Sequence, residues 1–343
     1  MALGRLVWVT LKALLTSAAS HLGPVELVDD LTFSDKAHVA RLRTTDGATV
    51  VAKRPADSGA FGRELEALRV LPEAVRPGLV AAGDDILVLE DLGTGPSLAD
   101  LLLGRAPAAA ESALMAWAGT LGDALHATLR LGTPEQPEGL EAGVDEMRQL
   151  AWALDVPVPA GVDDDVAWIA SVLARPGPWV AFCPSDTCPD NNRVLPDGSV
   201  RLFDFEGAGW RHAALEAAYC RAPFCTCWCM ARLPEGVVGR MEAAFLVALA
   251  PADPTGFAEV VTPAAVYYTL VQFRWFRRFV IDERPVPPRT PSTGRQNVYV
   301  RLLAVAAERE KLPALAEVAE RLATAIVRRW PDAAAMPLYP AFR

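Results

Sequence analysis

Three polar residues in one short stretch, Asp186, Asn191 and Asp204, frame a hairpin pattern. Strand-forming runs at 193–195 and 199–203 flank a Pro-Asp-Gly turn, a combination that predicts two antiparallel strands. A hairpin of this size brings Asn191 and Asp204 side by side at its open end, with Asp186 on the loop leading in. The spacing therefore predicts that one amide and two carboxylates meet at a single place in the fold.

These three side chains suit one kind of chemistry. Amide and carboxylate oxygens are ligands that Mg²⁺ prefers, so Asn191 and Asp204 are the candidate metal ligands. Asp186 is the candidate catalytic residue, placed to orient a hydroxyl group and accept its proton. Phosphoryl transfer from ATP depends on such positioning and charge neutralisation, which makes it the leading hypothesis.

Two charged residues upstream occur in an order that fits the same chemistry. Lys53 lies near the end of a β-rich run at 48–54, just after an Asp-Gly turn signal. Glu64 follows eleven residues later, and leucines 65, 68 and 71 mark one face of a predicted helix around it. Taken singly, each is most simply a solvated surface charge, but no structural requirement demands this order of residues.

Residues 84–103 contain a third signal. The segment predicts a strand, a Gly-rich hinge with Glu90 and Leu92, and a helix capped by Ser97. Such a hinge would connect two domains. Because ligand pockets commonly form at domain interfaces, we expect a ligand to contact it.

The order of lysine, glutamate, hinge and D-x₄-N…D-F-E motif resembles the aminoglycoside phosphotransferase and choline kinase superfamily. The resemblance covers residues 25 to about 220, including a helix at 121–126 that is found in most members. It implies an α+β, two-lobed, protein-kinase-like fold. Residues 1–96 would form a small antiparallel-sheet lobe, and residues 97–343 a larger, mainly helical lobe with the catalytic loop and acceptor site.

The resemblance also implies a role for each upstream residue. Lys53 would contact the α- and β-phosphates of ATP, and Glu64 would hold Lys53 in place. Glu90 and Leu92 would lie in the linker that contacts adenine, and Ser34 would donate to the phosphates. The implied cofactors are ATP and Mg²⁺.

Three positions depart from the family pattern. Pro184 stands where the family's His-Gly-Asp motif has its histidine, a structural tether, so the catalytic loop must be held in another way. The segment at 32–37 that would cover the phosphates contains no glycine. Cys188 stands where many members have histidine. None of these changes removes a residue that phosphoryl transfer needs.

All six cysteines fall within one stretch of 47 residues, an unusual concentration. They are Cys183, Cys188, Cys220, Cys225, Cys227 and Cys229. In a cytoplasmic enzyme we expect reduced thiols that pack as small apolar side chains. Metal ligation and redox sensing remain alternatives, although no Cys-x₂-Cys pair is present.

The acceptor pocket is expected in the helical lobe. Glu206, Trp210 and Glu216 follow the metal ligands in sequence and are the nearest candidates. An aromatic-rich helix at 267–279 carries arginines 274, 277 and 278 on one face. We expect those arginines to lie in water over core aromatics, and the alternative is an anion-binding wall. Three aspartates at 163–165 are read as a helix N-terminus.

Composition narrows the class of protein. The chain of 343 residues has a net charge of −9 and no basic cluster, which argues against nucleic-acid binding. No apolar run reaches the ~18 residues of a membrane span. Lys12 interrupts the apolar run within residues 1–23, so we expect a helix packed on the N-terminal lobe rather than an export signal. The expected location is the cytoplasm.

The sequence thus predicts an ATP-dependent phosphotransferase that moves the γ-phosphoryl group to a hydroxyl of a small molecule. A protein acceptor is not expected, because the chain has no Ala-Pro-Glu activation-segment motif. One alternative is a pseudokinase or nucleotide-binding scaffold, and another is a cysteine-based metal or redox protein. Further helices are predicted at 109–130, 235–249, 258–281 and 312–329, with loops at 132–141 and 282–294.

Overall fold

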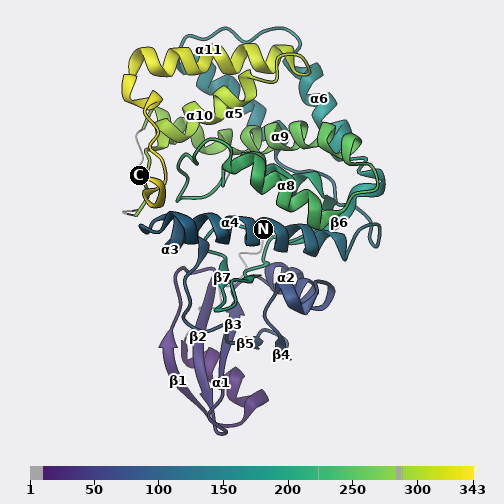
Figure 1. Cartoon of the computed structure of the whole chain (residues 1–343), viewed down its shortest axis with the longest axis vertical. Coiled ribbons are helices and arrows are strands. Elements are labelled where there is room, and N and C mark those ends of the chain that lie inside the picture. The colour runs from purple at the N-terminus through teal and green to yellow at the C-terminus, as the bar shows by residue number, and fades with distance from the viewer. Residues whose placement is uncertain (1–10, 223, 283–286, 288) are drawn as a thin grey trace, which may run out of the picture.

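Two lobes make up the molecule, as Figure 1 shows for the computed structural model of the chain. The structure describes residues 11–222, 224–282, 287 and 289–343. The N-terminal lobe is a twisted sheet with two helices, and the larger C-terminal lobe is mainly helical. The fold class predicted from the sequence is confirmed.

The small lobe is built on an antiparallel sheet with the strand order β1-β2-β3-β5-β4. Its strands are β1 (Val25–Asp30), β2 (Ala37–Thr44), β3 (Thr49–Pro55), β4 (Leu79–Ala82) and β5 (Leu87–Glu90). Gly47 forms the turn between β2 and β3 with a φ of +89°, a conformation that glycine adopts without steric cost. The register pairs Val39 of β2 with Lys53 of β3, and the Lys53 side chain reaches Asp204 of the large lobe.

Two helices flank this sheet. Helix α1 (Leu11–Leu22) buries Leu14 and Ala18 in a cluster with the apolar side chains of β2, β3 and β5. The predicted N-terminal helix is therefore confirmed from residue 11 onward, and residues 1–10 lie outside the described part of the chain. Helix α2 (Ser58–Val70) carries Glu64. Asp57 precedes the helix as its N-cap, and the Asp57 side chain accepts the Ala60 N–H.

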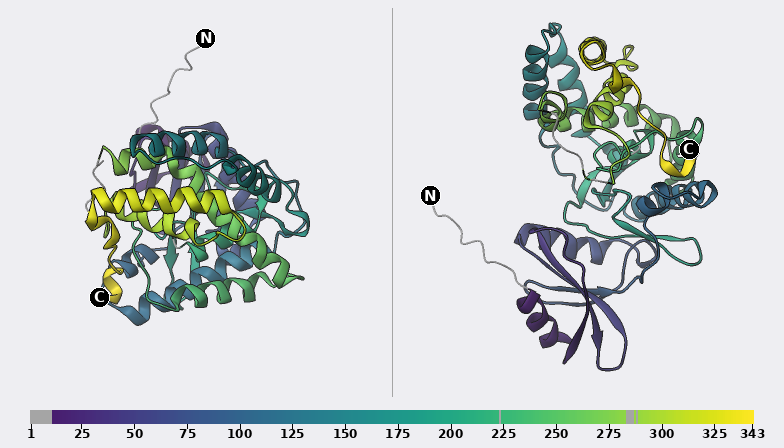
Figure 2. Two further views of the ribbon diagram at one scale, coloured as in Figure 1. Left: turned by 90° about the horizontal axis from the view of Figure 1, so that it is seen from above. Right: turned by 90° about the vertical axis from the view of Figure 1, so that its left-hand side faces the viewer.

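The large lobe packs its helices around one extended core. Helix α4 runs along its lower face, next to the small lobe, as the second view in Figure 2 also shows. Trp117 of α4 is fully buried and contacts Phe224 edge-on. The helices are α3 (Leu98–Leu102), α4 (Pro107–His126), α5 (Leu140–Ala153), α6 (Val162–Leu173), α7 (Ala214–Arg221), α8 (Val237–Leu249), α9 (Pro254–Val280), α10 (Gly294–Ala306) and α11 (Pro313–Arg329).

Most of the helix predictions agree with the structure. The four helices predicted in the large lobe correspond to α4, α8, α9 and α11, and Ser97 caps α3 through a full capping box. The aspartates at 163–165 lie in the first turn of α6, as expected. Helices α5, α7 and α10 were not predicted, and α5 begins at Leu140, inside the predicted loop at 132–141. Within the described residues, no helix has the length and apolar character to cross a membrane.

Two short antiparallel pairs position the segment that carries Asp186, Asn191 and Asp204. Strand β6 (Val180–Cys183) pairs with β9 (Gly209–His212), and β7 (Asn192–Val194) pairs with β8 (Val200–Leu202). The predicted hairpin is therefore present. Its first strand begins and ends one residue earlier than predicted, and its second strand is one residue shorter at each end than the predicted range. Its backbone pairing extends to a bond from the Phe203 N–H to the Asn191 carbonyl, 3.1 Å long.

Candidate active site

A cleft of about 810 Å³ lies where the sheet of the small lobe meets the β7–β8 hairpin. All the site residues predicted from the sequence line it. They are Ser34, Lys53, Glu64, Glu90, Leu92, Asp186, Asn191 and Asp204. The structure thus brings together side chains that are up to 170 residues apart in the sequence.

Lys53 is the most constrained charge in this cleft. Its ammonium lies 2.6 Å from Glu64 Oε2 and 2.5 Å from Asp204 Oδ1, and its side chain is 9% exposed. Burial alone would lower the pKa of Lys53, but the two carboxylates outweigh burial and raise it, so the lysine stays charged. The predicted Lys53–Glu64 pair is present, and Asp204 is the lysine's second partner.

The hinge after β5 forms another wall of the cleft. Arg41 Nε donates to Asp91 Oδ2 at 2.8 Å, and its Nη2 donates to the Gly93 carbonyl at 3.1 Å, which fixes the hinge conformation. The Glu90 carboxylate accepts the Gly78 N–H and pairs with Arg201, and the Glu90 N–H donates to the Gly78 carbonyl at 2.8 Å, so Glu90 is held in place at the wall of the cleft. Apolar side chains form the surroundings, including Leu31, Val39, Val51, Leu89 and Phe203. A flat aromatic base would fit between them.

Asp186 lies at the centre of the catalytic loop, where it is open to the cleft. The surrounding protein limits its contact with water, and Asp204, Asp190 and Glu206 add negative charge nearby. Together these effects raise the pKa of Asp186 to about 6. A carboxylate with this pKa is ionised at neutral pH and is a better proton acceptor than an ordinary aspartate.

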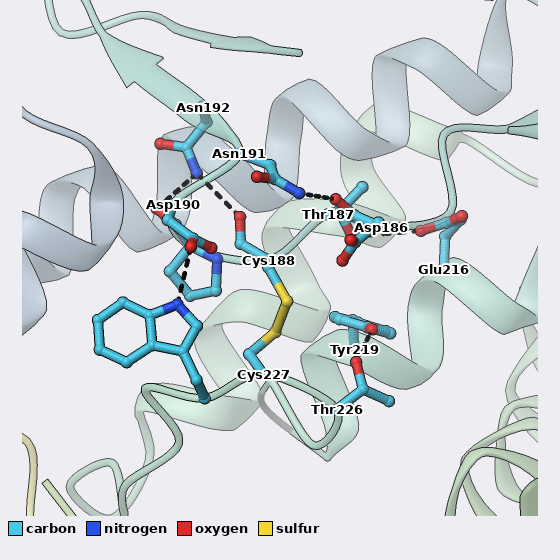
Figure 3. Close-up of a disulfide and its surroundings, with 12 residues drawn as sticks. Asp186, Thr187, Cys188, Asp190, Asn191, Asn192, Glu216, Tyr219, Thr226 and Cys227 are labelled. Atoms are coloured by element: carbon cyan, nitrogen blue, oxygen red, sulfur yellow. Dashed lines mark hydrogen bonds between the residues drawn. A yellow bond between two sulfur atoms is a disulfide. The ribbon is translucent and has the colours of Figure 1, made fainter. Parts of the chain in front are cut away.

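Glu216 of α7 holds the loop around Asp186 through two hydrogen bonds, from a position beneath the loop. Its Oε1 accepts the Ser185 N–H at 2.8 Å. Its Oε2 accepts the Thr187 hydroxyl at 3.4 Å (Figure 3). Arg211 supports the same turn by donating to Ser185 Oγ at 2.9 Å. Burial raises the pKa of Glu216 to about 7. The two bonds flank Asp186, so Glu216 determines where the candidate base lies.

The two candidate metal ligands meet beside Asp186. Asn191 donates its amide N–H to the Asp186 carbonyl at 2.9 Å, which leaves the amide oxygen available as a ligand. Asp204 has a φ of +68°, a left-handed conformation that is uncommon outside glycine and concentrates at functional sites. An amide oxygen and a carboxylate oxygen are hard donors, so this pair fits Mg²⁺ or Ca²⁺.

The segment before β2 approaches the cleft from the small lobe. Ser34 Oγ accepts the Lys36 N–H at 3.3 Å, and Ser34 forms a bridge with Ala37. The ammonium of Lys36 lies 2.9 Å from Glu206 Oε1, a contact between the two lobes. Glu206 raises the pKa of Lys36. Lys36 was not among the predicted site residues, because a lysine in a loop carries no distinguishing signal.

The expected acceptor residues fall in different places. Glu206 lines the cleft. Trp210 packs against Phe182 and donates to Glu66 Oε1 at 3.1 Å. Glu216 is buried beneath the loop that carries Asp186. The expectation that Trp210 and Glu216 line the acceptor pocket is therefore wrong. Helix α9 exposes its arginines at 274, 277 and 278, and two of them, Arg274 and Arg278, lie beside Trp275. This agrees with the prediction that these arginines lie in water.

The cysteines correct one expectation. Cys188 and Cys227 form a disulfide, with their Cα atoms 5.8 Å apart, so these two are not reduced packing residues. The remaining four cysteines are free and buried, as expected. In the part of the chain that the structure describes, no cluster of three or more His, Cys, Asp or Glu side chains could hold a metal ion.

Asn192 supports the loop around Asp186 and was not predicted from the sequence. Its side chain is fully buried, donates to the Pro189 carbonyl at 2.9 Å and accepts the Leu98 N–H at 2.9 Å. It thereby ties the catalytic loop to the start of α3. For Glu216 a signal was available, because a single acid within the apolar run of residues 213–219 must find partners once it is buried.

Comparison with known proteins supports the fold. No family model matches the chain, and no curated protein matches it. Solved structures do match. An aminoglycoside phosphotransferase from Alicyclobacillus acidocaldarius is 15% identical, with a TM-score of 0.52 over 94% of this chain and 96% of that one.

Two further structures have the same fold. Plasmodium vivax ethanolamine kinase is 12% identical, with a TM-score of 0.51 over 87% of this chain and 88% of that one. Amicoumacin kinase hAmiN, solved with AMP-PNP, Ca²⁺ and Ami, is 11% identical, with a TM-score of 0.51 over 92% of this chain and 94% of that one. The predicted resemblance is confirmed at the level of fold.

Proposed function

We propose, from the fold that this chain shares with small-molecule kinases, that it transfers the γ-phosphoryl group of ATP to a hydroxyl of a small molecule. One observation carries the proposal. The buried Lys53 joins the carboxylate of α2 to the candidate metal ligand Asp204 in the cleft that also contains Asp186. Packing gives no reason to bury a lysine between two acids, since a buried ion pair seldom adds net stability.

Each residue has a distinct part in this proposal. When nucleotide is bound, the hinge and its apolar neighbours would contact the base. Lys53 would contact the α- and β-phosphates and would keep its ion pair with Glu64. Asn191 and Asp204 hold the metal ion, which neutralises phosphate charge when bound. Asp186 would orient the acceptor hydroxyl and take its proton as the new O–P bond forms, while the bond from the γ-phosphorus to the bridging oxygen breaks and ADP leaves.

The acceptor side of the cleft is lined by Glu206, Asp190, Thr226 and Trp228. The whole cleft falls within the ~300–1,000 Å³ typical of ligand pockets, which favours a small acceptor over a folded protein. We also propose a cytoplasmic location, because an ATP-dependent enzyme needs that supply of nucleotide.

Water can serve as a weak acceptor in the first test. We expect the purified protein to convert Mg-ATP slowly to ADP, and to form phosphorylated products from some members of a panel of hydroxylated small molecules. Mass spectrometry of the products would identify them. Nucleotide binding without turnover of water or any panel member would favour the scaffold alternative.

The pH dependence of turnover is a specific prediction. Asp186 must be ionised to accept a proton, so we expect kcat/KM to fall tenfold per pH unit below an apparent pKa of about 6. Glu216 also titrates near this range, with a pKa of about 7, so Glu216→Gln is the control. In the Glu216→Gln variant, kcat/KM should still fall below a pH of about 6, because Asp186 still titrates there. A profile that stays flat between pH 5 and 7.5 would contradict the assignment of Asp186 as base.

A further inference from the structure

The disulfide joins the catalytic loop to a distant segment. Cys188 lies two residues after Asp186, and Cys227 lies 39 residues further along, in the stretch 224–233 that follows α7. Figure 3 shows the bridge below the catalytic loop. Both cysteines line the cleft, with exposed fractions of 8% and 5%. The bridge therefore forms part of the wall beside the candidate base.

Residues 224–233, which we call the acceptor segment, depend on side chains for their position. They form turns and extended backbone, and their pairing with another strand is a single bridge between Arg232 and Leu338. Phe224 anchors one end against Trp117. Between these ends, Trp228 Nε1 donates to Asp190 Oδ2 at 2.7 Å, and Thr226 bonds to Tyr219. The disulfide is the covalent attachment of this middle part to the catalytic loop.

Cys188 also belongs to the hydrogen-bond frame of the active site. Its carbonyl accepts the Asn191 N–H at 2.9 Å, and the Asn191 side chain donates to the Asp186 carbonyl. A displacement of Cys188 would therefore reach both the candidate base and a candidate metal ligand. An error of about 1 Å in such a site can cost ~10²-fold in rate.

We propose that the Cys188–Cys227 disulfide is a redox-sensitive brace that holds the acceptor segment against the catalytic loop and so positions both for transfer. The proposal rests on the proposed function, since it assigns the segment to the acceptor side. Reduction by a dithiol gives two cysteine thiols and the oxidised, cyclic disulfide of the reductant, so two electrons and two protons pass to the bridge.

The proposed location favours a responsive bridge over a purely structural one. An ATP-dependent enzyme works where nucleotide is plentiful, and in the cytoplasm disulfides are rare and usually redox-linked. In addition, burial raises the pKa of the Cys225 and Cys229 thiols, the latter to about 12. Thiols in that state are poor nucleophiles, so Cys225 and Cys229 compete weakly for the bridge although they flank Cys227. The raised pKa values therefore explain why the pairing is specific, and they do not make the bridge easier to reduce.

The test compares the oxidised and reduced full-length protein. Peptide mapping under non-reducing conditions should find Cys188 linked to Cys227. After dithiothreitol treatment, we expect faster hydrogen exchange in the acceptor segment and the catalytic loop. Turnover of Mg-ATP with water as acceptor should fall about tenfold, with the KM for ATP changing less than twofold.

Two variants make the comparison specific. C188S/C227S should resemble the reduced protein and should not respond to dithiothreitol. Cys225→Ala, in the same segment but outside the bridge, should respond as the wild type does. If C188S/C227S fails to fold, the wild-type comparison still stands.

Two results would contradict the proposed brace. One is the absence of the linked Cys188–Cys227 peptide, and the other is verified reduction of the disulfide with unchanged hydrogen exchange and Mg-ATP turnover. If the oxidised protein neither binds nor turns over Mg-ATP, the proposed function fails instead. In that case, the comparison of hydrogen exchange between the oxidised and the reduced protein would still test whether the disulfide holds the two segments together.

Discussion

Substitution of Asp186 by asparagine is expected to lower kcat by about 10³-fold while leaving Mg-ATP affinity unchanged or slightly tighter. The large loss follows because the amide cannot accept the hydroxyl proton, and general bases contribute ~10²–10⁴-fold to rate. The affinity should not fall, because Asp186 lies close to other carboxylates, and removing its charge reduces repulsion of the anionic nucleotide. Steady-state kinetics and calorimetry would measure the two effects separately.

Asp197→Asn is the matched control for this experiment. Asp197 lies in the turn of the same hairpin, is exposed, and accepts bonds from Ser199 that an asparagine can retain. Its turnover should equal that of the wild type. Full activity of the Asp186 variant would show that the proton leaves by another route and would remove Asp186 from the mechanism.

Substitution of Lys53 by methionine is expected to abolish nucleotide binding and to reduce the free energy of unfolding by about 3 kcal/mol. The stability effect arises because Glu64, which is 1% exposed, loses its counter-ion, and breaking a buried pair leaves an uncompensated charge. Burial already raises the pKa of the Glu64 carboxyl, so the variant should take up a proton there. Denaturant unfolding and calorimetry would measure the two losses.

The double variant Lys53→Met, Glu64→Gln separates the two roles of the lysine. It should recover most of the lost stability, because neither partner remains charged, but it should not recover nucleotide binding. A Lys53→Met protein with wild-type stability and affinity would mean that the lysine is neither buried nor functional as described.

The sequence predicted the parts of this molecule that local chemistry determines. The hairpin follows from its turn and strand formers, and the helix around Glu64 follows from its leucine spacing. The site residues could be grouped because their order along the chain resembles a known superfamily. Because of that resemblance, residues in separate local motifs could be predicted to lie close together in the folded protein.

The sequence could not predict what depends on contacts between distant segments. The pairing of Cys188 with Cys227 requires knowledge of how the acceptor segment returns to the catalytic loop, and spacing alone leaves every pairing open. The burial of Glu216 likewise follows from the packing of α7 under the loop. Trp210 was misassigned because its direction on β9 is set by pairing with β6.

The most direct test of the account is a calorimetric titration of the wild type and Asp204→Asn with Mg-ATP. Asparagine suits the left-handed backbone at this position, so the substitution removes the charge without adding strain. We predict metal-dependent binding to the wild type that is lost with a chelator and weakened at least ~10-fold by the substitution. No binding to the wild type, or binding of equal strength to both proteins with and without metal, would contradict the assignment of this cleft as a Mg-ATP site.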